Sequence, residues 1–277
     1  QFDKSLNMIE KSVEIFRKYK REIPLVSALD RKGLIHRERG EYPEALKAFH
    51  EAKAIAQSNK IILGTVLGNM ADVYSLVGNF DEAIDYTQQA VTYFQRKGDK
   101  SREALYLGNL ALWYSETQKF EEAEKIYRKI IPLARELETK INEGLFSGNF
   151  GDLLMVMCKY EEAESYFLST IEILKERYAL VAEIFSASYA KLTLLLGDKA
   201  LAKKRIDQVN ESLLGNMADE LIKFKAKKAY IYHEVGEIEE GKDIVESIQR
   251  LFIEHGFTEG SGIARAMKEV QALYSDD

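Results

Sequence analysis

The sequence predicts an all-α solenoid, and two observations support this fold class. A pattern of the form Gly-x-aromatic-x-x-Ala returns about every 40 residues, most clearly over residues 40–45 and 78–83. On both sides of each copy, apolar residues recur with the 3.6-residue period of a helix. Self-similarity at such a period is typical of solenoids, in which each helical unit stacks only on its neighbours.

Four further copies of the pattern are less complete. Residues 118–123 and 158–163 keep the aromatic residue and the alanine but carry Gln118 and Cys158 in place of glycine. Residues 197–202 and 236–241 keep the glycine but lose the aromatic residue. With the glycine set at position 15, the six units begin at Val26, Gly64, Ala104, Gly144, Glu183 and Ile222. The repeats therefore predict six helix pairs over residues 26–255.

The recurring positions have physical explanations. Glycine at position 15 ends the first helix of a pair, because the chain must there adopt a left-handed conformation. Small residues at positions 8 and 20 allow the two helices to approach closely. Position 10 is apolar in every unit, so Trp113 is interpreted as a core residue. The alanines at position 20 are Ala45, Ala83, Ala123, Ala163 and Ala202.

Both ends of the chain predict one further helix each. Residues 3–20 are amphipathic, and setting Phe2 at position 17 places Ser5, Ile9 and Ser12 at positions 20, 24 and 27. Residues 1–25 are then the second helix of a partial repeat, and residues 256–277 a capping helix. The chain is expected to be one domain over residues 1–277, either a fragment of a larger protein or one that begins with an unusual cap.

The composition narrows the function classes. A net charge of −6 argues against a general nucleic-acid binder. No segment approaches the ~20 apolar residues of a membrane span, so no membrane partner is expected. The single cysteine favours a reducing compartment, and a cytoplasmic location is expected. The four histidines show no metal-ligand spacing and no phosphate-binding loop occurs, so we expect no metal, no cofactor and no enzyme.

The repeats resemble the tetratricopeptide repeat family. That family places small residues at positions 8, 20 and 27 and aromatic residues at 11, 17 and 24, where this chain has Tyr74, Phe80 and Tyr127 among others. Its usual period is 34 residues, so the longer period here is similar to the repeats of kinesin light chains, a spindle-orientation adaptor and bacterial signalling proteins. The resemblance implies a right-handed superhelix whose first helices line a groove.

Asparagine is the most regular residue expected in that groove. Asn69, Asn109 and Asn149 all fall at position 6, and each follows a glycine. Three glycines within helices suggest that something approaches the backbone closely, since each costs up to about 1 kcal/mol relative to alanine. Asparagine both donates and accepts hydrogen bonds, which suits holding a peptide backbone. The alternative is a structural ladder of asparagines that bond between neighbouring helices.

Other residues at groove positions carry mixed chemistry. Acidic and apolar side chains lie in the central repeats, among them Asp72, Leu112 and Asp152. Lysines follow in the last two repeats and predict either a basic end that favours an acidic ligand or a solvated lysine face. They match only part of the clamp with which some family members hold chaperone C-termini, so that function is not expected. The lysines are Lys191, Lys223 and Lys227.

The leading hypothesis is a non-catalytic scaffold that binds a peptide or a helical segment of a partner protein in its groove. The alternatives are a sensor module of a bacterial regulatory protein, which binds an effector or signalling peptide, and a self-association domain. The sequence does not name the partner, the pathway, the organism or the oligomeric state.

Overall fold

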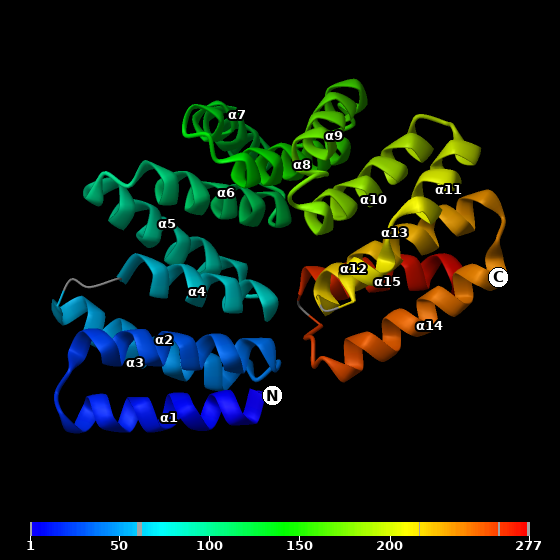
Figure 1. The fold of residues 1–277 in the computed structure, drawn as a ribbon. Coiled ribbons are helices and arrows are strands. Elements are labelled where there is room, and N and C mark those ends of the chain that lie inside the picture. Colours follow the sequence, from blue (N-terminus) through cyan, green and yellow to red (C-terminus); the bar gives the residue numbers. More distant parts are fainter. Residues whose placement is uncertain (1, 60–62, 216, 260, 276–277) are drawn as a thin grey trace. The chain divides into compact units, whose positions relative to one another are not determined.

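The computed structural model describes residues 2–59, 63–215, 217–259 and 261–275, which form fifteen α-helices and no strand (Figure 1). A single helix precedes six pairs and another follows them, which confirms the all-α solenoid predicted from the repeats. The flanking helices are α1 (Phe2–Lys18) and α15 (Gly262–Ser275). The pairs are α2 (Glu22–Glu38) and α3 (Tyr42–Asn59), α4 (Leu63–Leu76) and α5 (Phe80–Lys97), α6 (Lys100–Glu116) and α7 (Phe120–Glu136), α8 (Lys140–Val156) and α9 (Tyr160–Leu174), α10 (Ala179–Leu195) and α11 (Lys199–Gln208), and α13 (Ala218–Val235) and α14 (Ile238–Glu254).

The fifth pair differs from the expectation by one short helix, α12 (Glu211–Leu214). The preceding helix α11 has only 10 residues and ends at Gln208, and the backbone of the next residue, Val209, is extended. Leu214 in α12 is fully buried and belongs to the same apolar cluster as Ile206 and Leu221. The short helix therefore places an apolar side chain in the core. In the other pairs, a second helix of full length places an apolar side chain there.

The chain divides into two compact units, Gln1–Trp113 and Tyr114–Asp277, and each is described by itself. In the first unit, α1 packs on α2, and the pairs α2–α3 and α4–α5 share one core that includes Val26, Phe49 and Met70. In the second unit, α8 packs on both α7 and α9, and α15 packs on α13 and α14 (Figure 1). The assignment of the whole chain to one domain stays a prediction.

The turn inside each pair has the backbone geometry predicted for position 15. All six residues at this position have positive φ, including the two that are not glycine, Gln118 and Cys158. A left-handed residue is therefore required there whichever side chain the sequence provides. The φ values are 73° for Gly40, 79° for Gly78, 62° for Gln118, 58° for Cys158, 97° for Gly197 and 88° for Gly236.

The small residues at positions 8 and 20 lie where two helices of a pair meet. Ala45, Ala83 and Ala123 are fully buried. A Cβ added to Gly33, at position 8, would stand 2.5 Å from the ring of Phe49 in the second helix of the same pair. Such a separation is well inside van der Waals contact, so the aromatic ring occupies space that only glycine leaves open.

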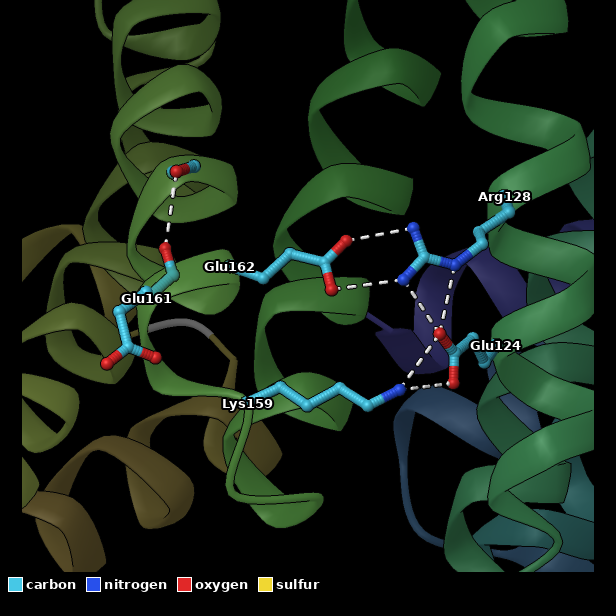
Figure 2. A network of polar contacts seen from close by, with 6 residues as sticks. Glu124, Arg128, Lys159, Glu161 and Glu162 are labelled. Atoms are coloured by element: carbon cyan, nitrogen blue, oxygen red, sulfur yellow. Dashed lines mark hydrogen bonds and ion pairs between the residues drawn. The ribbon is translucent and has the colours of Figure 1, made fainter.

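A polar network joins α7 and α9 in the second unit (Figure 2). The guanidinium of Arg128 pairs with Glu124 of its own helix at 2.7 Å and with Glu162 of α9 at 2.8 Å. It also lies over the ring of Phe150, 5.0 Å from the centroid. Lys159 pairs with the same Glu124 at 2.8 Å. The planar guanidinium can stack on the ring and bind two carboxylates at once, so Arg128 connects successive second helices.

Candidate functional site

The nine residues predicted for the groove lie on first helices, and none of them is fully buried. We call the side of the first helices that carries positions 2, 5, 6 and 9 the first-helix face. In the first unit this face includes Asn69 and Asp72 on α4, and Asn109 and Leu112 on α6. In the second unit it includes Asn149 and Asp152 on α8, Lys191 on α10, and Lys223 and Lys227 on α13.

Asn69 is bonded to the neighbouring first helix. Its side-chain amide donates to Oδ1 of Asp30 on α2, at 2.8 Å. Burial raises the pKa of Asp30, and the hydrogen bond from Asn69 opposes that rise by stabilising the carboxylate. At this residue the structure therefore favours the structural alternative, in which position 6 connects adjacent helices, although the acceptor is an aspartate and not a second asparagine.

Asn109 and Asn149 differ from Asn69. Both side chains are partly exposed, and neither forms a hydrogen bond with any residue in the described part of the chain. Lys227, at position 6 of the sixth repeat, donates from Nζ to the buried hydroxyl of Ser188, which also lies at position 6, at 2.6 Å. In the first unit Asn69 is therefore bonded to a neighbouring helix, and in the second unit Lys227 is, whereas within the described residues the amides of Asn109 and Asn149 keep their hydrogen-bonding capacity.

Two of the three glycines that precede the asparagines, Gly68 and Gly148, are explained by packing within the protein. A Cβ added to Gly68 would overlap the ring of Tyr106 on α6. A Cβ added to Gly148 would stand 2.5 Å from the ring of Phe185 on α10. In both cases the group that approaches the glycine closely is an aromatic residue at position 3 of the following first helix. These two glycines therefore give no support for a ligand.

Asp72 lies on the first-helix face, near the C-terminal end of α4. Its carboxylate is 3.6 Å from the guanidinium of Arg37, and about a third of its side chain, 34%, is exposed. Burial nevertheless raises the pKa of Asp72 to about 6, because the surrounding protein removes much of the solvent that would stabilise its charge, and Arg37 opposes this only in part. The side chain can therefore change its charge near neutral pH.

Two of the three predicted lysines come together in the second unit. Lys191 lies with its Nζ 4.9 Å from the ring centroid of Tyr230. Burial and the positive charge of Lys227 both lower the pKa of Lys191, while the carboxylates of Asp152 and Glu269 act in the opposite direction. An anion brought to this surface would relieve the repulsion between the two lysines.

Lys223 is neutralised within the protein. Its Nζ lies 2.7 Å from Oε1 of Glu220, one helical turn earlier in α13. Desolvation disfavours the charge of Lys223, but Glu220 and Asp219 outweigh it and raise the pKa of the lysine. Glu220 was not predicted, although its i, i+3 spacing to the lysine on a predicted helix was a usable signal. Tyr230 and Ser188 were not predicted either, because their contacts depend on the packing of separate helices.

Two cavities lie away from the first-helix face. One of about 710 Å³ opens between α3, α4 and α5 and includes Leu67, Tyr93 and Arg96 in its wall. Another of about 200 Å³ is bordered by α9, α10 and α11 and includes Tyr189 and Arg205. Neither contains any of the nine predicted residues.

The described residues provide neither a cluster of metal ligands nor a membrane-spanning helix. In this part of the chain, no three His, Cys, Asp or Glu side chains gather where they could hold a metal ion. Among the helices that the structure describes, none combines the length and the apolar composition needed to cross a bilayer.

Comparisons with solved structures show proteins of similar fold. A Rap protein complexed with competence and sporulation factor shares 16% identity and a TM-score of 0.64, over 92% of this chain and 76% of the other. NprR in complex with its cognate peptide NprX shares 17% identity and a TM-score of 0.65, over 99% and 84% of the two chains. A protein of Podosopora anserina assigned to the kinesin light chains shares 13% identity and a TM-score of 0.52, over 68% and 93%.

The sequence itself also matches a known family. A comparison with curated proteins found no match. The family model of the tetratricopeptide repeat, however, matches residues 24–95 and 62–136, which contain the first two complete repeats and most of the third. The helix pairs, the left-handed turns at position 15 and the small residues at positions 8 and 20 extend the same register through residue 255. Residues 24–136 therefore match the tetratricopeptide repeat family, and the chain is similar to that family in its fold.

Proposed function

We propose that this protein is a non-catalytic interaction scaffold whose first-helix face binds a peptide or a helical segment of a partner. The observation that carries the proposal is the state of Asn109 and Asn149, whose amides are partly exposed and form no hydrogen bond within the described residues. An amide that donates and accepts together matches the alternating N–H and C=O groups of a peptide backbone.

The lysines of the second unit favour a ligand with negative charge. Lys191 and Lys227 repel one another, and neither forms an ion pair with a described residue. A ligand that carries Asp or Glu beside its bound backbone would reduce this repulsion and gain charge-assisted hydrogen bonds. We therefore propose that the preferred ligand is acidic near the part that reaches α10 and α13.

A second candidate is a sensor module that responds to a signalling peptide. In two structures of similar fold, a Rap protein holds competence and sporulation factor and NprR holds its cognate peptide NprX. The similarity to these two proteins concerns the fold. A sensor module would use the same first-helix face as the scaffold, and it would differ from the scaffold in the process that peptide binding controls. A third candidate, self-association, predicts a change of mass with concentration in sedimentation experiments.

The test is peptide binding to asparagine variants. Peptides selected from a random display library on the full chain would be measured by isothermal titration against Asn109→Ala, Asn149→Ala and the control Asn7→Ala, which is exposed on α1. Losing hydrogen bonds at a desolvated contact costs ~1–3 kcal/mol each, so the double variant should bind at least tenfold more weakly with an unchanged melting temperature. Unchanged affinity in the double variant, or no selected peptide at all, would refute the proposal.

A further inference from the structure

The cavity of about 200 Å³ in the second unit lies where the fifth repeat departs from the regular pattern. Its helix α11 has 10 residues, whereas the second helices of the other five pairs have between 15 and 18. Val209 is at position 27, which is helical in the other pairs but extended here. Gln208 and Val209 both stand in the wall of the cavity, so the early end of α11 borders it.

Two opposite charges line this cavity, Glu183 of α10 and Arg205 of α11. They occupy positions 1 and 23 of the fifth repeat, and in the other five repeats both positions carry uncharged residues. The two charges are therefore particular to the repeat that forms the cavity. At position 1 the other residues are Val26, Gly64, Ala104, Gly144 and Ile222, and at position 23 they are Ala48, Tyr86, Ile126, Tyr166 and Ile244.

The guanidinium of Arg205 is held by buried side chains. It lies over the ring of Tyr189, 4.0 Å from the centroid, and donates a hydrogen bond to Oγ1 of Thr193. The hydroxyl of Thr193 donates in turn to the backbone carbonyl of Tyr189 at 2.8 Å, and the hydroxyl of Tyr189 donates to Glu164 at 2.9 Å. A guanidinium has five N–H donors, so Arg205 is fixed in position and retains donors for an anion.

The carboxylate of Glu183 is also held in place. Its Oε2 accepts a hydrogen bond from the backbone N–H of Asn210 at 3.1 Å, just beyond the end of α11. In the described part of the chain, Glu183 and Arg205 form no ion pair with each other or with another residue. Each can therefore form a charge-assisted hydrogen bond with a ligand group of opposite charge.

We propose that this cavity binds a free α-amino acid with an aliphatic side chain. Arg205 would bind its carboxylate, Glu183 its ammonium group, and Ile171 and Val209 would contact its side chain. Cavities for drug-sized ligands measure about 300–1,000 Å³, so this smaller one suits a molecule of fewer atoms. The site lies outside the first-helix face, so it goes beyond the peptide binding proposed above and is tested independently of it.

The charges argue for a zwitterion over two other kinds of ligand. A small inorganic anion could bind Arg205, but it would leave Glu183 without a partner and be repelled by it. A long peptide carries its ammonium and carboxylate groups at opposite ends, so a cavity of this size cannot hold both. A free amino acid carries the two groups on a single carbon atom and can pair with both residues at once.

The test compares leucine with two derivatives that each lack one charge. Leucinamide keeps the ammonium group and loses the carboxylate, whereas N-acetyl-leucine keeps the carboxylate and loses the ammonium group. Isothermal titration with the full chain should show that leucine binds at least tenfold more tightly than either derivative.

Two variants assign each charge to its partner. Glu183→Gln keeps an acceptor for the N–H of Asn210, and it should bind leucine and N-acetyl-leucine equally. Arg205→Gln keeps a donor for Thr193, and it should bind leucine and leucinamide equally. Both should bind leucine at least tenfold more weakly than the wild type, with circular dichroism unchanged. The matched controls Glu246→Gln and Arg250→Gln, at exposed residues of α14, should leave every affinity unchanged.

Three results would overturn the proposal. The first is no binding of leucine to the wild-type protein, or equal binding of leucine and both derivatives. The second is equal wild-type binding of leucine and N-acetyl-leucine that Arg205→Gln alone abolishes, which would identify a site for a simple carboxylate. The third is leucine binding that neither Glu183→Gln nor Arg205→Gln weakens, which would place the amino acid elsewhere on the protein.

Discussion

The side chain of Tyr274 on α15 occupies the space in which a Cβ on Gly241 would lie. Its hydroxyl donates a hydrogen bond to the backbone carbonyl of Ala229, at 2.7 Å. Gly241 is at position 20 and Ala229 at position 8 of the sixth repeat. Tyr274 of the last helix therefore packs against both of the small residues of this repeat. The departure from alanine at Gly241, which makes this copy of the repeat look weak, is explained by the cap that it accommodates.

Gly241→Ala should therefore destabilise the protein although alanine favours helices. The new methyl group would displace Tyr274, and overpacking of this kind typically costs about 1–3 kcal/mol, against a gain of up to ~1 kcal/mol in helix propensity. Thermal unfolding followed by circular dichroism measures the difference. The matched control is Gly215→Ala, whose Cβ would meet only the carbonyl of Ser212 at 3.5 Å and should change little. Equal melting temperatures for the two variants would contradict the packing described.

The close contact inside the helix pairs predicts a second effect. Ala83 at position 20 is fully buried, so Ala83→Leu should force α4 and α5 apart and cost about 1–3 kcal/mol. Ala123→Leu, at the same position of the third repeat, should act alike. Ala54→Leu, which adds the same atoms to an exposed residue of α3, is the control. Chemical denaturation compares all three, and a stable Ala83→Leu protein would mean that the repeat register is wrong.

The sequence predicted the pairs well because their determinants are local. A left-handed turn, two small residues and a 3.6-residue period are properties of single segments, and each is visible without knowing what packs against it. The register even placed Phe2 at position 17, where α1 begins, as α3 and α5 begin at Tyr42 and Phe80. The short helix α12 was missed because a four-residue turn has no period to detect.

The site was less predictable because its chemistry depends on pairs from separate helices. Spacing placed Asn69, Asn109 and Asn149 at one repeat position, but only the structure distinguishes the amide bound to Asp30 from the two that form no hydrogen bond with a described residue. The glycines before them indicated a close approach without showing that Tyr106 and Phe185 make it. Only the pair of Lys223 and Glu220 could have been found from the sequence, since both residues lie on one helix.

The raised pKa of Asp72 predicts a pH dependence of stability. In the unfolded chain its carboxyl ionises near its usual pKa of 3.8, whereas in the folded protein it holds its proton to about pH 6. The folded state binds more protons between these values, so wild-type stability should fall relative to Asp72→Asn as the pH rises from about 4 to 6. The side chain is partly exposed, and screening by solvent limits the difference above pH 7 to about 1 kcal/mol.

Denaturant unfolding of both proteins at several pH values measures this difference. Asp207→Asn is a control in which the pH dependence should have the opposite sign. Burial raises the pKa of Asp207, but Lys203, Tyr232 and Lys228 outweigh this effect and lower the pKa overall. Its stabilising contribution is present above the usual pKa and is lost as the pH falls. If the Asp72→Asn and wild-type curves stay parallel from pH 4 to 7, Asp72 is better solvated than the structure indicates.

The lysines of the second unit should contribute unequally to binding an acidic peptide. The positive charges of Lys191 and Lys227 repel each other, and an acidic peptide would relieve this repulsion. Lys191→Gln and Lys227→Gln should therefore each weaken the binding of such a peptide about tenfold at low salt. Glutamine is chosen because its amide can still donate to Ser188 in place of Lys227. Lys223→Gln should change affinity less than threefold, since Glu220 already neutralises that lysine.

Isothermal titration at two ionic strengths tests this ranking. Raising the salt concentration screens exposed charges, so the losses caused by Lys191→Gln and Lys227→Gln should shrink, while the small effect of Lys223→Gln should stay constant. A neutral peptide of the same length should bind all four proteins alike. The largest loss in Lys223→Gln would show that a ligand displaces Glu220 from its lysine, and the acidic end of the ligand would then lie over the start of α13 and not between α10 and α13.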